Sequence, residues 1–182
     1  IMGILNVTPD SFSDGGKWNE MDHALKHTEN MIAEGADILD IGGESTRPGH
    51  TPVSAQEEIE RVLPVIEAVK KRFDIPISVD TYKGCVAEES LKNGADLIND
   101  IWGLKADDKM AGVIAKYDAA CYLMHNRNEA DYKNFMEDMK NDLRETLRLA
   151  KEAGIREDGI MTDPGVGFGK TYENNLEAIR CV

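Results

Sequence analysis

Residues 75–100, IPISVDTYKGCVAEESLKNGADLIND, hold one complete unit of the pattern that decides the fold. Ile75–Val79 is a short apolar run rich in Ile and Val, and a similar run starts at Leu97. Each run is bounded by Pro, Gly, Asp or Asn, which is typical of a strand buried on both faces. The segment between the runs ends at Gly94, which suits the left-handed position that follows a helix. The unit is therefore a strand, a helix and a second strand.

Outward from this unit, the same alternation recurs about six times along the chain. The other expected strands are Met2–Leu5, Ile38–Ile41, Ala119–Met124 and Gly159–Met161. The clearest helix is expected over residues 54–73, where Ser54 and Glu57 have the spacing of a capping box. Pro64 lies inside this helical pattern and is expected to kink or break it. A second periodic segment predicts a helix over residues 132–150, and Gly35 and Gly154 suit helix ends like Gly94.

Strands that alternate with helices imply a parallel sheet with helical crossovers. Two architectures fit, an open doubly wound sheet and a (β/α)₈ TIM barrel. A complete barrel takes about 250 residues, so six units in 182 residues make an incomplete one, with about six of eight units. No change of composition marks a linker, and we expect one domain over residues 1–182.

Polar residues at the ends of the expected strands favour the α/β barrel. These are Asn6, Asp40, Asp80, Asn99, Asp100 and Asp163, and His125 directly follows another strand. In a barrel the carboxyl ends of the strands meet at one mouth, whereas in an open sheet they spread along an edge. A single Asp at a strand end is usually a turn or cap residue, but six polar strand ends indicate a common site.

Composition excludes several classes of protein. The chain is 41% hydrophobic, which is enough for a packed core. Its net charge of −13, from 21 basic and 34 acidic residues, argues against a general nucleic-acid binder. No apolar run is long enough to span a membrane, and residues 1–6 show no export signal. Three cysteines without a C-x-x-C pair fit a reducing cytoplasm, with no disulfide framework and no structural zinc.

The ends of the chain suggest a fragment. It opens on Ile1 and stops at Val182 inside an expected helix. We therefore expect that the last two strand–helix units of the barrel are missing.

The set with the most specific chemistry is Asp80, Asn99 and Asp163. One carboxylate can accept both adjacent donors of a planar 2-amino-4-oxo heterocycle, and an Asn can match its mixed donor and acceptor edge. Two Asp and one Asn therefore fit a pterin or a guanine-like ring. Two alternatives remain open. These residues can form hydrogen bonds that only stabilise the barrel mouth, or two carboxylates can act as general acid and base on a sugar.

Three loops add groups for an anionic substrate. Residues 6–16 form a long polar loop, and the Asn6 oxygen suits Mg²⁺. In residues 42–49, Arg47 presents a fork of donors matched to phosphate. Residues 164–171, PGVGFGKT, fit neither a phosphate loop nor a dinucleotide fingerprint, because the glycine spacing is wrong. This last segment is either a tight turn or a wall of the pocket.

Two of these motifs are specific to a family. VTPDSFSDGG at residues 7–16 and DIGGESTRPG at residues 40–49 resemble dihydropteroate synthase. Shorter matches, SVDT at 78–81, IND at 98–100, LMH at 123–125 and DPGVGFGK at 163–170, extend the resemblance over essentially the whole chain. The resemblance implies a (β/α)₈ barrel that is usually a homodimer. Its implied reaction joins 6-hydroxymethyl-7,8-dihydropterin diphosphate to 4-aminobenzoate in folate synthesis, with Mg²⁺ as cofactor.

The resemblance also implies residue roles. Asn6 is then the Mg²⁺ ligand, and Asp80, Asn99 and Asp163 hold the pterin ring, with Ile101, Met124 and Phe168 packed near it. Phe12, Thr46, Arg47 and Pro48 then belong to the aminobenzoate side, and Asp14 is the loop carboxylate that faces the pterin methylene. Asp14 and Arg47 are the implied catalytic residues.

The chain departs from the family pattern in two places. The family continues with a Ser-Arg-Lys and an Arg-x-His motif that this sequence does not contain, and after His125 it usually reads Met-x-Gly rather than Asn126-Arg127-Asn128. Three alternatives follow: a pterin-binding methyltransferase barrel of corrinoid metabolism, a non-catalytic pterin-binding homologue, and a glycosidase-like barrel. The loop at residues 7–16 speaks against the methyltransferase, because such domains lack it.

Overall fold

The computed structural model describes residues 1–7, 17–45 and 51–181. Strands and helices alternate throughout this part of the chain. The strands are β1 (Met2–Asn6), β2 (Ile38–Gly42), β3 (Ile77–Asp80), β4 (Leu97–Asp100), β5 (Ala120–Met124) and β6 (Ile160–Asp163). The helices are α1 (Lys17–Ala33), α2 (Ala55–Arg72), α3 (Gly84–Lys92), α4 (Met110–Lys116), α5 (Phe135–Ala153) and α6 (Tyr172–Cys181), with a short 3₁₀ turn, η2 (Glu157–Gly159), before β6.

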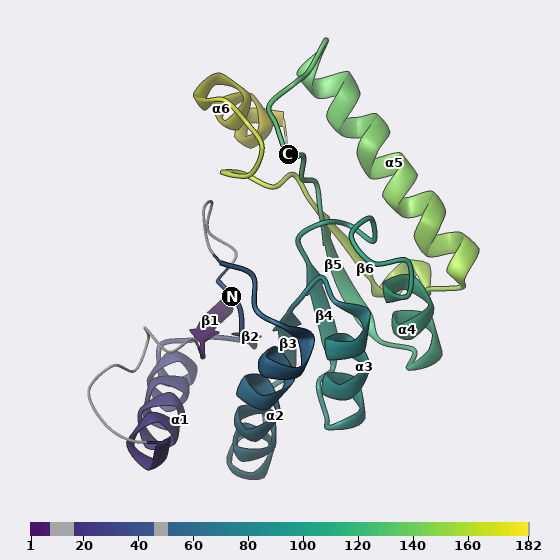
Figure 1. Ribbon diagram of the computed structural model, residues 1–182. Helices are drawn as coiled ribbons and strands as arrows, with labels where there is room; N and C mark the ends of the chain where they lie inside the picture. The colour runs from purple at the N-terminus through teal and green to yellow at the C-terminus, as the bar shows by residue number, and fades with distance from the viewer. Residues whose placement is uncertain (8–16, 46–50, 182) are drawn as a thin grey trace.

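The strand order identifies the architecture. The strands lie in the order β1-β2-β3-β4-β5-β6, and every neighbouring pair is parallel. A doubly wound sheet reverses its strand order at a switch point, whereas a barrel wall adds each strand beside the last. Figure 1 shows α1 to α4 arranged in sequence order along the sheet. The predicted six successive units of a (β/α)₈ barrel are confirmed.

The two faces of the sheet have opposite character. The side chains that face the helices are apolar and fully buried: Leu39, Ile41, Ile77, Val79, Ile98 and Leu123. They belong to one core with the inner faces of α2, α3 and α4. Helix α6 packs instead on the beginning of α5, where Ala178 meets Phe135 and Met139 in a separate cluster. The opposite face carries the polar residues of the strand ends, together with apolar side chains such as the exposed Ile4 and Met161.

Helix α2 begins as the sequence predicts. The Ser54 hydroxyl accepts a hydrogen bond of 3.2 Å from the Glu57 amide, which satisfies one free N–H of the first turn. The helix runs through Pro64 without interruption, so the prediction of a break there is wrong, and the alternative of a kink stays a prediction. Val62 and Val65, on either side of Pro64, are both buried against the core, and this packing offsets the lost backbone hydrogen bond. The helix ends are also as expected, since Gly35, Gly94 and Gly154 all have positive φ.

In the part of the chain that is described, no helix combines the length and the apolar character needed to cross a membrane.

The α2 cap gives a first prediction. Ser54→Ala removes the acceptor for the Glu57 amide and should lower the free energy of unfolding by about 1 kcal/mol, measured by urea denaturation. Ser54→Asn, which keeps a capping oxygen, should restore most of the loss. Equal destabilisation by both variants would mean that the capping oxygen is not the source of the stabilisation.

Candidate active site

The pairing of the strands places the predicted polar residues on one face. In parallel strands, paired residues point to the same side of the sheet. Asn6 pairs with Gly42, Gly42 with Asp80, and Asp80 with Asn99. The row continues from Asn99 to Tyr122 on β5. We call Asn6, Gly42, Asp80, Asn99 and Tyr122 the carboxyl-end row, because it crosses the sheet at the strand ends opposite the helix side.

Asp40 lies one layer below this row and joins it through Asn99. The Asn99 side-chain amide donates to Asp40 Oδ2 at 3.0 Å, and Asp40 is only 4% exposed. Burial raises the pKa of Asp40, although the neighbouring Ser78 hydroxyl and the bond from Asn99 oppose the rise. Sequence reasoning noted Asp40 as a strand-end residue but gave it no role. It lies on the same face as Asp80 and Asn99, and its hydrogen bond to Asn99 makes it part of the site.

Two carboxylate oxygens of this site lack a partner. Asp40 Oδ1 and Asp80 Oδ1 are buried and accept no hydrogen bond from any described residue. Burial raises the pKa of Asp80 well above its ordinary value, and the nearby charge of Asp40 raises it further. Unpaired buried acceptors are costly for a folded protein, and a donor from a bound molecule is one way in which they are satisfied.

Asn6 and Asp80 lie on either side of Gly42. A Cβ atom added to Gly42 would lie 3.3 Å from Asn6 Oδ1 and 3.6 Å from Asp80 Oδ2. Both side-chain oxygens therefore border the same small space, which a larger residue at position 42 would fill. The structure thus brings the expected metal ligand beside the expected ring-binding carboxylate.

Asp163 is on the same face but farther along the sheet. It pairs with Met124, so these two residues lie beyond the carboxyl-end row on β5 and β6. Asp163 is exposed, and its Oδ1 accepts a bond of 2.5 Å from the Gly165 amide. Met124 is buried, and Phe168 is half-buried in the loop that follows β6. Asp80 and Asn99 are therefore direct neighbours, while Asp163 faces them from across β5.

Asp100, the last residue of β4, differs from the other predicted strand-end residues because it pairs with Leu123 and lies on the helix face. Asp100 is buried, but its two oxygens accept from the Trp102 amide at 2.9 Å and the Leu104 amide at 2.8 Å. Asp100 therefore fixes the turn after the strand and has no free acceptor for a ligand. Ile101 is buried within that turn.

Five of the predicted site residues lie outside the described part of the chain. They are Phe12, Asp14, Thr46, Arg47 and Pro48.

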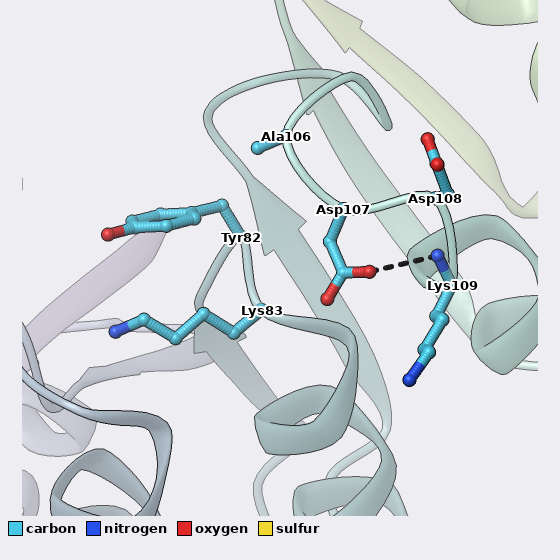
Figure 2. A pocket seen from close by; sticks show the side chains of 6 residues that line it. All are labelled: Tyr82, Lys83, Ala106, Asp107, Asp108 and Lys109. Carbon is cyan, nitrogen blue, oxygen red and sulfur yellow. Dashed lines mark hydrogen bonds between the residues drawn. The ribbon is translucent and has the colours of Figure 1, made fainter.

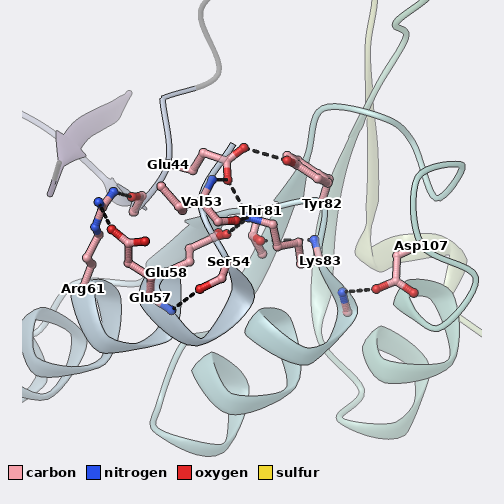
Figure 3. Close-up of polar contacts among 12 residues, drawn as sticks. Glu44, Val53, Ser54, Glu57, Glu58, Arg61, Thr81, Tyr82, Lys83 and Asp107 are labelled. Carbon is pink, nitrogen blue, oxygen red and sulfur yellow. Dashed lines mark hydrogen bonds and ion pairs between the residues drawn. The ribbon is translucent and has the colours of Figure 1, made fainter. Parts of the chain in front are cut away.

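A cluster of buried charges, which sequence reasoning missed, lies at the rim of the sheet (Figure 3). Lys83 Nζ bonds to Glu44 Oε2 and to Glu58 Oε2, both at 2.5 Å, and to the Val53 carbonyl at 3.0 Å. Tyr82 donates to Glu44 Oε1 at 2.6 Å. Glu44 and Glu58 are almost fully buried. No local sequence signal links these residues, because Lys83 is 39 positions from Glu44 and 25 from Glu58.

The rim cluster, formed by Glu44, Glu58, Tyr82 and Lys83, keeps the Glu44 carboxylate ionised. Burial alone would raise the pKa of Glu44, but the hydrogen bonds from Lys83 and Tyr82 outweigh it and lower that pKa to about 2. The cluster joins Glu44, just after β2, to Val53, just before α2, since the Val53 amide also donates to Glu44 Oε2 at 3.0 Å. Glu44 and Glu58 therefore have hydrogen-bond partners, whereas Asp40 Oδ1 and Asp80 Oδ1 have none among the described residues.

An open cavity of about 410 Å³ lies on the outer side of this rim. Figure 2 shows Tyr82 and Lys83 on one side of it and Asp107, Asp108 and Lys109 on the other. Asp107 accepts hydrogen bonds from the Gly84 amide at 2.7 Å and from the Lys109 amide at 2.9 Å. Its carboxylate therefore binds free amides at the starts of both α3 and α4. No residue of the carboxyl-end row lines this cavity, which is therefore separate from the candidate active site.

Among residues 1–7, 17–45 and 51–181, no group of three or more His, Cys, Asp or Glu side chains could hold a metal ion. Mg²⁺ needs few protein ligands when it shares its coordination with water and substrate phosphate.

The parallel barrel wall and the polar row at the carboxyl ends of its strands are typical of an α/β-barrel enzyme, whose site lies at the barrel mouth. A family profile described as "Pterin binding enzyme" matches residues 2–182. The chain belongs to this family of pterin-binding enzymes.

Named relatives narrow the family further. Dihydropteroate synthase of Clostridium beijerinckii is 62% identical over 179 residues, and that of Bacillus subtilis is 57% identical over 176. These alignments cover 98% and 97% of this chain, but only 66% and 62% of the two relatives. The chain therefore spans less than two thirds of the length of each.

Solved structures agree with this assignment. A dihydropteroate synthase from Clostridium difficile, crystallised in the presence of pteroic acid, has a TM-score of 0.96 and 53% identity. The enzyme of Xanthomonas albilineans with 4-aminobenzoic acid has a TM-score of 0.93 and 41% identity. The matches cover 98% and 99% of this chain, and 68% and 66% of the other chains.

The rim cluster predicts a pH-dependent stability. Glu44→Gln removes the charge that pairs with Lys83 and should lower the free energy of unfolding by about 2–3 kcal/mol at pH 7. Because the pKa of Glu44 is lowered from 4.5 to about 2, its stabilisation is complete above pH 4.5 and is lost as the pH falls towards 2. Urea denaturation of both proteins across this range should show the difference shrinking.

The matched control is Glu34→Gln, because Glu34 is exposed. It should unfold like the wild type at every pH. A Glu44→Gln difference that stays constant from pH 5 to pH 2.5 would contradict the assigned pairing.

Proposed function

We propose that the protein that carries this chain is a dihydropteroate synthase, which joins 6-hydroxymethyl-7,8-dihydropterin diphosphate to 4-aminobenzoate and releases diphosphate. The observation that carries the proposal is the pair of buried, unpartnered oxygens of Asp40 and Asp80 beside Asn99. A pterin offers adjacent N–H and NH₂ donors, which a carboxylate accepts together. The names of the relatives support the same reaction.

In this proposal Asp80, Asn99 and Asp163 hold the pterin ring by its polar edge. Met124 and Phe168 provide apolar contacts near Asp163, and Ile101 packs behind the turn that follows Asn99. Desolvation by the ligand costs little at Asp80, because its Oδ1 already lacks a hydrogen bond before the ring binds. Ring binding would therefore replace an unfavourable arrangement by paired donors and acceptors.

Asn6 fits a metal ligand in this scheme. Its amide oxygen borders the same space as Asp80 Oδ2, across Gly42, and hard oxygen ligands suit Mg²⁺. When bound, Mg²⁺ supplies charge neutralisation for the departing diphosphate. Few protein ligands are needed, because phosphate oxygens and water complete the coordination.

The protein's own contribution is to bind, orient and exclude water. The ring can share the positive charge that develops on its methylene group as diphosphate leaves, so an SN1-like path is open. The weak aniline nucleophile then needs positioning and a dry site rather than a covalent enzyme intermediate. We assign Arg47 to the leaving diphosphate, Asp14 to the charge on the methylene, and Phe12, Thr46 and Pro48 to the aminobenzoate side.

We further propose that residues 1–182 belong to one pterin-binding domain and that the whole protein is a homodimer without nucleic-acid or membrane partners. A cytoplasmic location fits the three cysteines, because Cys85, Cys121 and Cys181 are all free thiols.

The test of the function is a reconstituted reaction. The full-length natural protein, with both substrates and Mg²⁺, should form 7,8-dihydropteroate and diphosphate. Pterin binding without product would indicate a non-catalytic homologue, and methyl transfer to a corrinoid would indicate the methyltransferase class.

Asp80 gives a prediction that separates binding from folding. Asp80→Asn should weaken binding of the pterin diphosphate by roughly 10- to 100-fold, the range of hydrogen bonds to a charged group, measured by calorimetric titration without 4-aminobenzoate. Its free energy of unfolding at pH 7 should stay equal or rise. The pKa of Asp80 is raised in the folded state, so this group weakens the fold at every pH above its ordinary value of 3.8, which includes pH 7.

Asp74→Asn is the matched control, since Asp74 is exposed before β3. It should leave both affinity and stability unchanged. Wild-type affinity in Asp80→Asn would contradict the role of Asp80 in ring binding.

Asn6 gives a separate prediction for the metal. Asn6→Ala should raise the Mg²⁺ concentration needed for half-maximal activity at least several-fold, because one protein ligand is lost. The affinity for the pterin without its diphosphate should not change. A Mg²⁺ dependence equal to that of the wild type would remove Asn6 from the metal site.

A further inference from the structure

The loop between β6 and α6 rests directly on the chain that follows β5. Gly165 and Gly169 both have positive φ. A Cβ atom on Gly165 would lie 2.0 Å from the His125 carbonyl oxygen, and one on Gly169 would lie 2.2 Å from the Arg127 carbonyl oxygen. Only glycine permits such an approach of two backbones. The segment from Gly165 to Lys170, which we call the β6 loop, is therefore seated on residues 125–127.

Three side-chain hydrogen bonds fix the far end of this loop. The Tyr132 hydroxyl donates to the Gly169 carbonyl at 2.7 Å. Lys170 Nζ donates to the Phe168 carbonyl at 2.8 Å and to the His125 carbonyl at 3.3 Å. Two of these bonds end on the carbonyl groups of Phe168 and of the next residue, Gly169. At the near end, the His125 amide donates to the Asp163 carbonyl at 2.8 Å, so both predicted pterin-contacting residues of this region depend on the same support.

Helix α5 holds the support in place. Arg127 Nε donates to Asp142 Oδ2 at 2.7 Å, and His125 Nε2 lies 3.0 Å from the same oxygen. Burial opposes ionisation, but the hydrogen bonds from Arg127 and His125 keep the pKa of Asp142 below its ordinary value. The Arg127 guanidinium lies over the Tyr132 ring, 4.5 Å from its centre. An ionised Asp142 thus orients Arg127, and Arg127 orients the tyrosine that reaches the β6 loop.

We propose that Tyr132, Arg127 and Asp142 are positioning residues that hold the β6 loop, and with it Asp163 and Phe168, in the geometry that receives the pterin ring. This inference rests on the proposed function. It gives a role to Asn126-Arg127-Asn128, the segment that departs from the family pattern. Asp80 and Asn99 need no such device, because they are fixed by strand pairing, whereas Phe168 lies on a loop with three glycines.

The decisive variant is Tyr132→Phe. It removes one hydroxyl and keeps the ring that lies under Arg127 and meets Phe135 edge-on at 5.0 Å. In the full-length protein, the affinity for pterin diphosphate should fall roughly three- to ten-fold, the range of one hydrogen bond. The kcat and the KM for 4-aminobenzoate should not change, because the loop contacts only the ring. Amide hydrogen exchange of residues 165–170 should become faster.

The matched control is Tyr172→Phe, because Tyr172 is 73% exposed at the start of α6. It should match the wild type in affinity and in exchange of the β6 loop. Asp142→Asn serves as a second variant and should weaken pterin binding in the same direction, again with the KM for 4-aminobenzoate unchanged.

The outcomes separate the two hypotheses. A wild-type protein that does not bind pterin diphosphate would overturn the proposed function, and the positioning role with it, before any variant is compared. Normal binding by the wild type with equal affinity in Tyr132→Phe and Tyr172→Phe would overturn the positioning role alone. So would a loss in Tyr132→Phe that affects kcat, both substrates and the unfolding midpoint together, because that pattern indicates general destabilisation.

Discussion

The parallel register of the strands is the constraint on which the site depends. It brings Asn6, Asp80 and Asn99 into one row although they are far apart in the sequence. A slip of one residue in any pairing would turn the side chains of that strand to the other face. The apolar face prevents the slip, because it would place Asp80 among the helices and Val79 at the mouth. The same hydrophobic packing that stabilises the fold therefore positions the chemistry.

Acidic side chains at the carboxyl end of the sheet occur in two different environments. Glu44 at the rim has Lys83 and Tyr82 as partners, and its pKa is lowered. Asp80 at the mouth has an oxygen with no partner among the described residues, and its pKa is raised. The difference lies in the donors supplied and not in the residue type. The donors at the rim keep Glu44 ionised, while Asp80 has an acceptor left over that the fold does not satisfy. In the proposed function, the donors of the ring fill this acceptor.

Local patterns in the sequence predict what local physics controls. Alternating apolar runs predict the six strands, and Ser54 with Glu57 predicts the start of α2. Long-range contacts leave no such signal: nothing near Lys83 indicates that it will bridge Glu44 and Glu58. Asp100 matches the strand-end pattern as well as Asp80 does, yet it bonds to the next turn. Only the alternation of faces along β4 distinguishes them, and that depends on where the strand ends.

The barrel mouth is built by two kinds of support with different rigidity. Asp80 and Asn99 stand on paired strands, where backbone hydrogen bonds fix the side chains directly. Phe168 stands on the β6 loop, which has no strand partner and must be held from outside. In the proposed function, tight binding of the ring requires both sides to be correctly placed. The bonds from Tyr132 and Lys170 to the loop carbonyls provide for that side what strand pairing provides for the other.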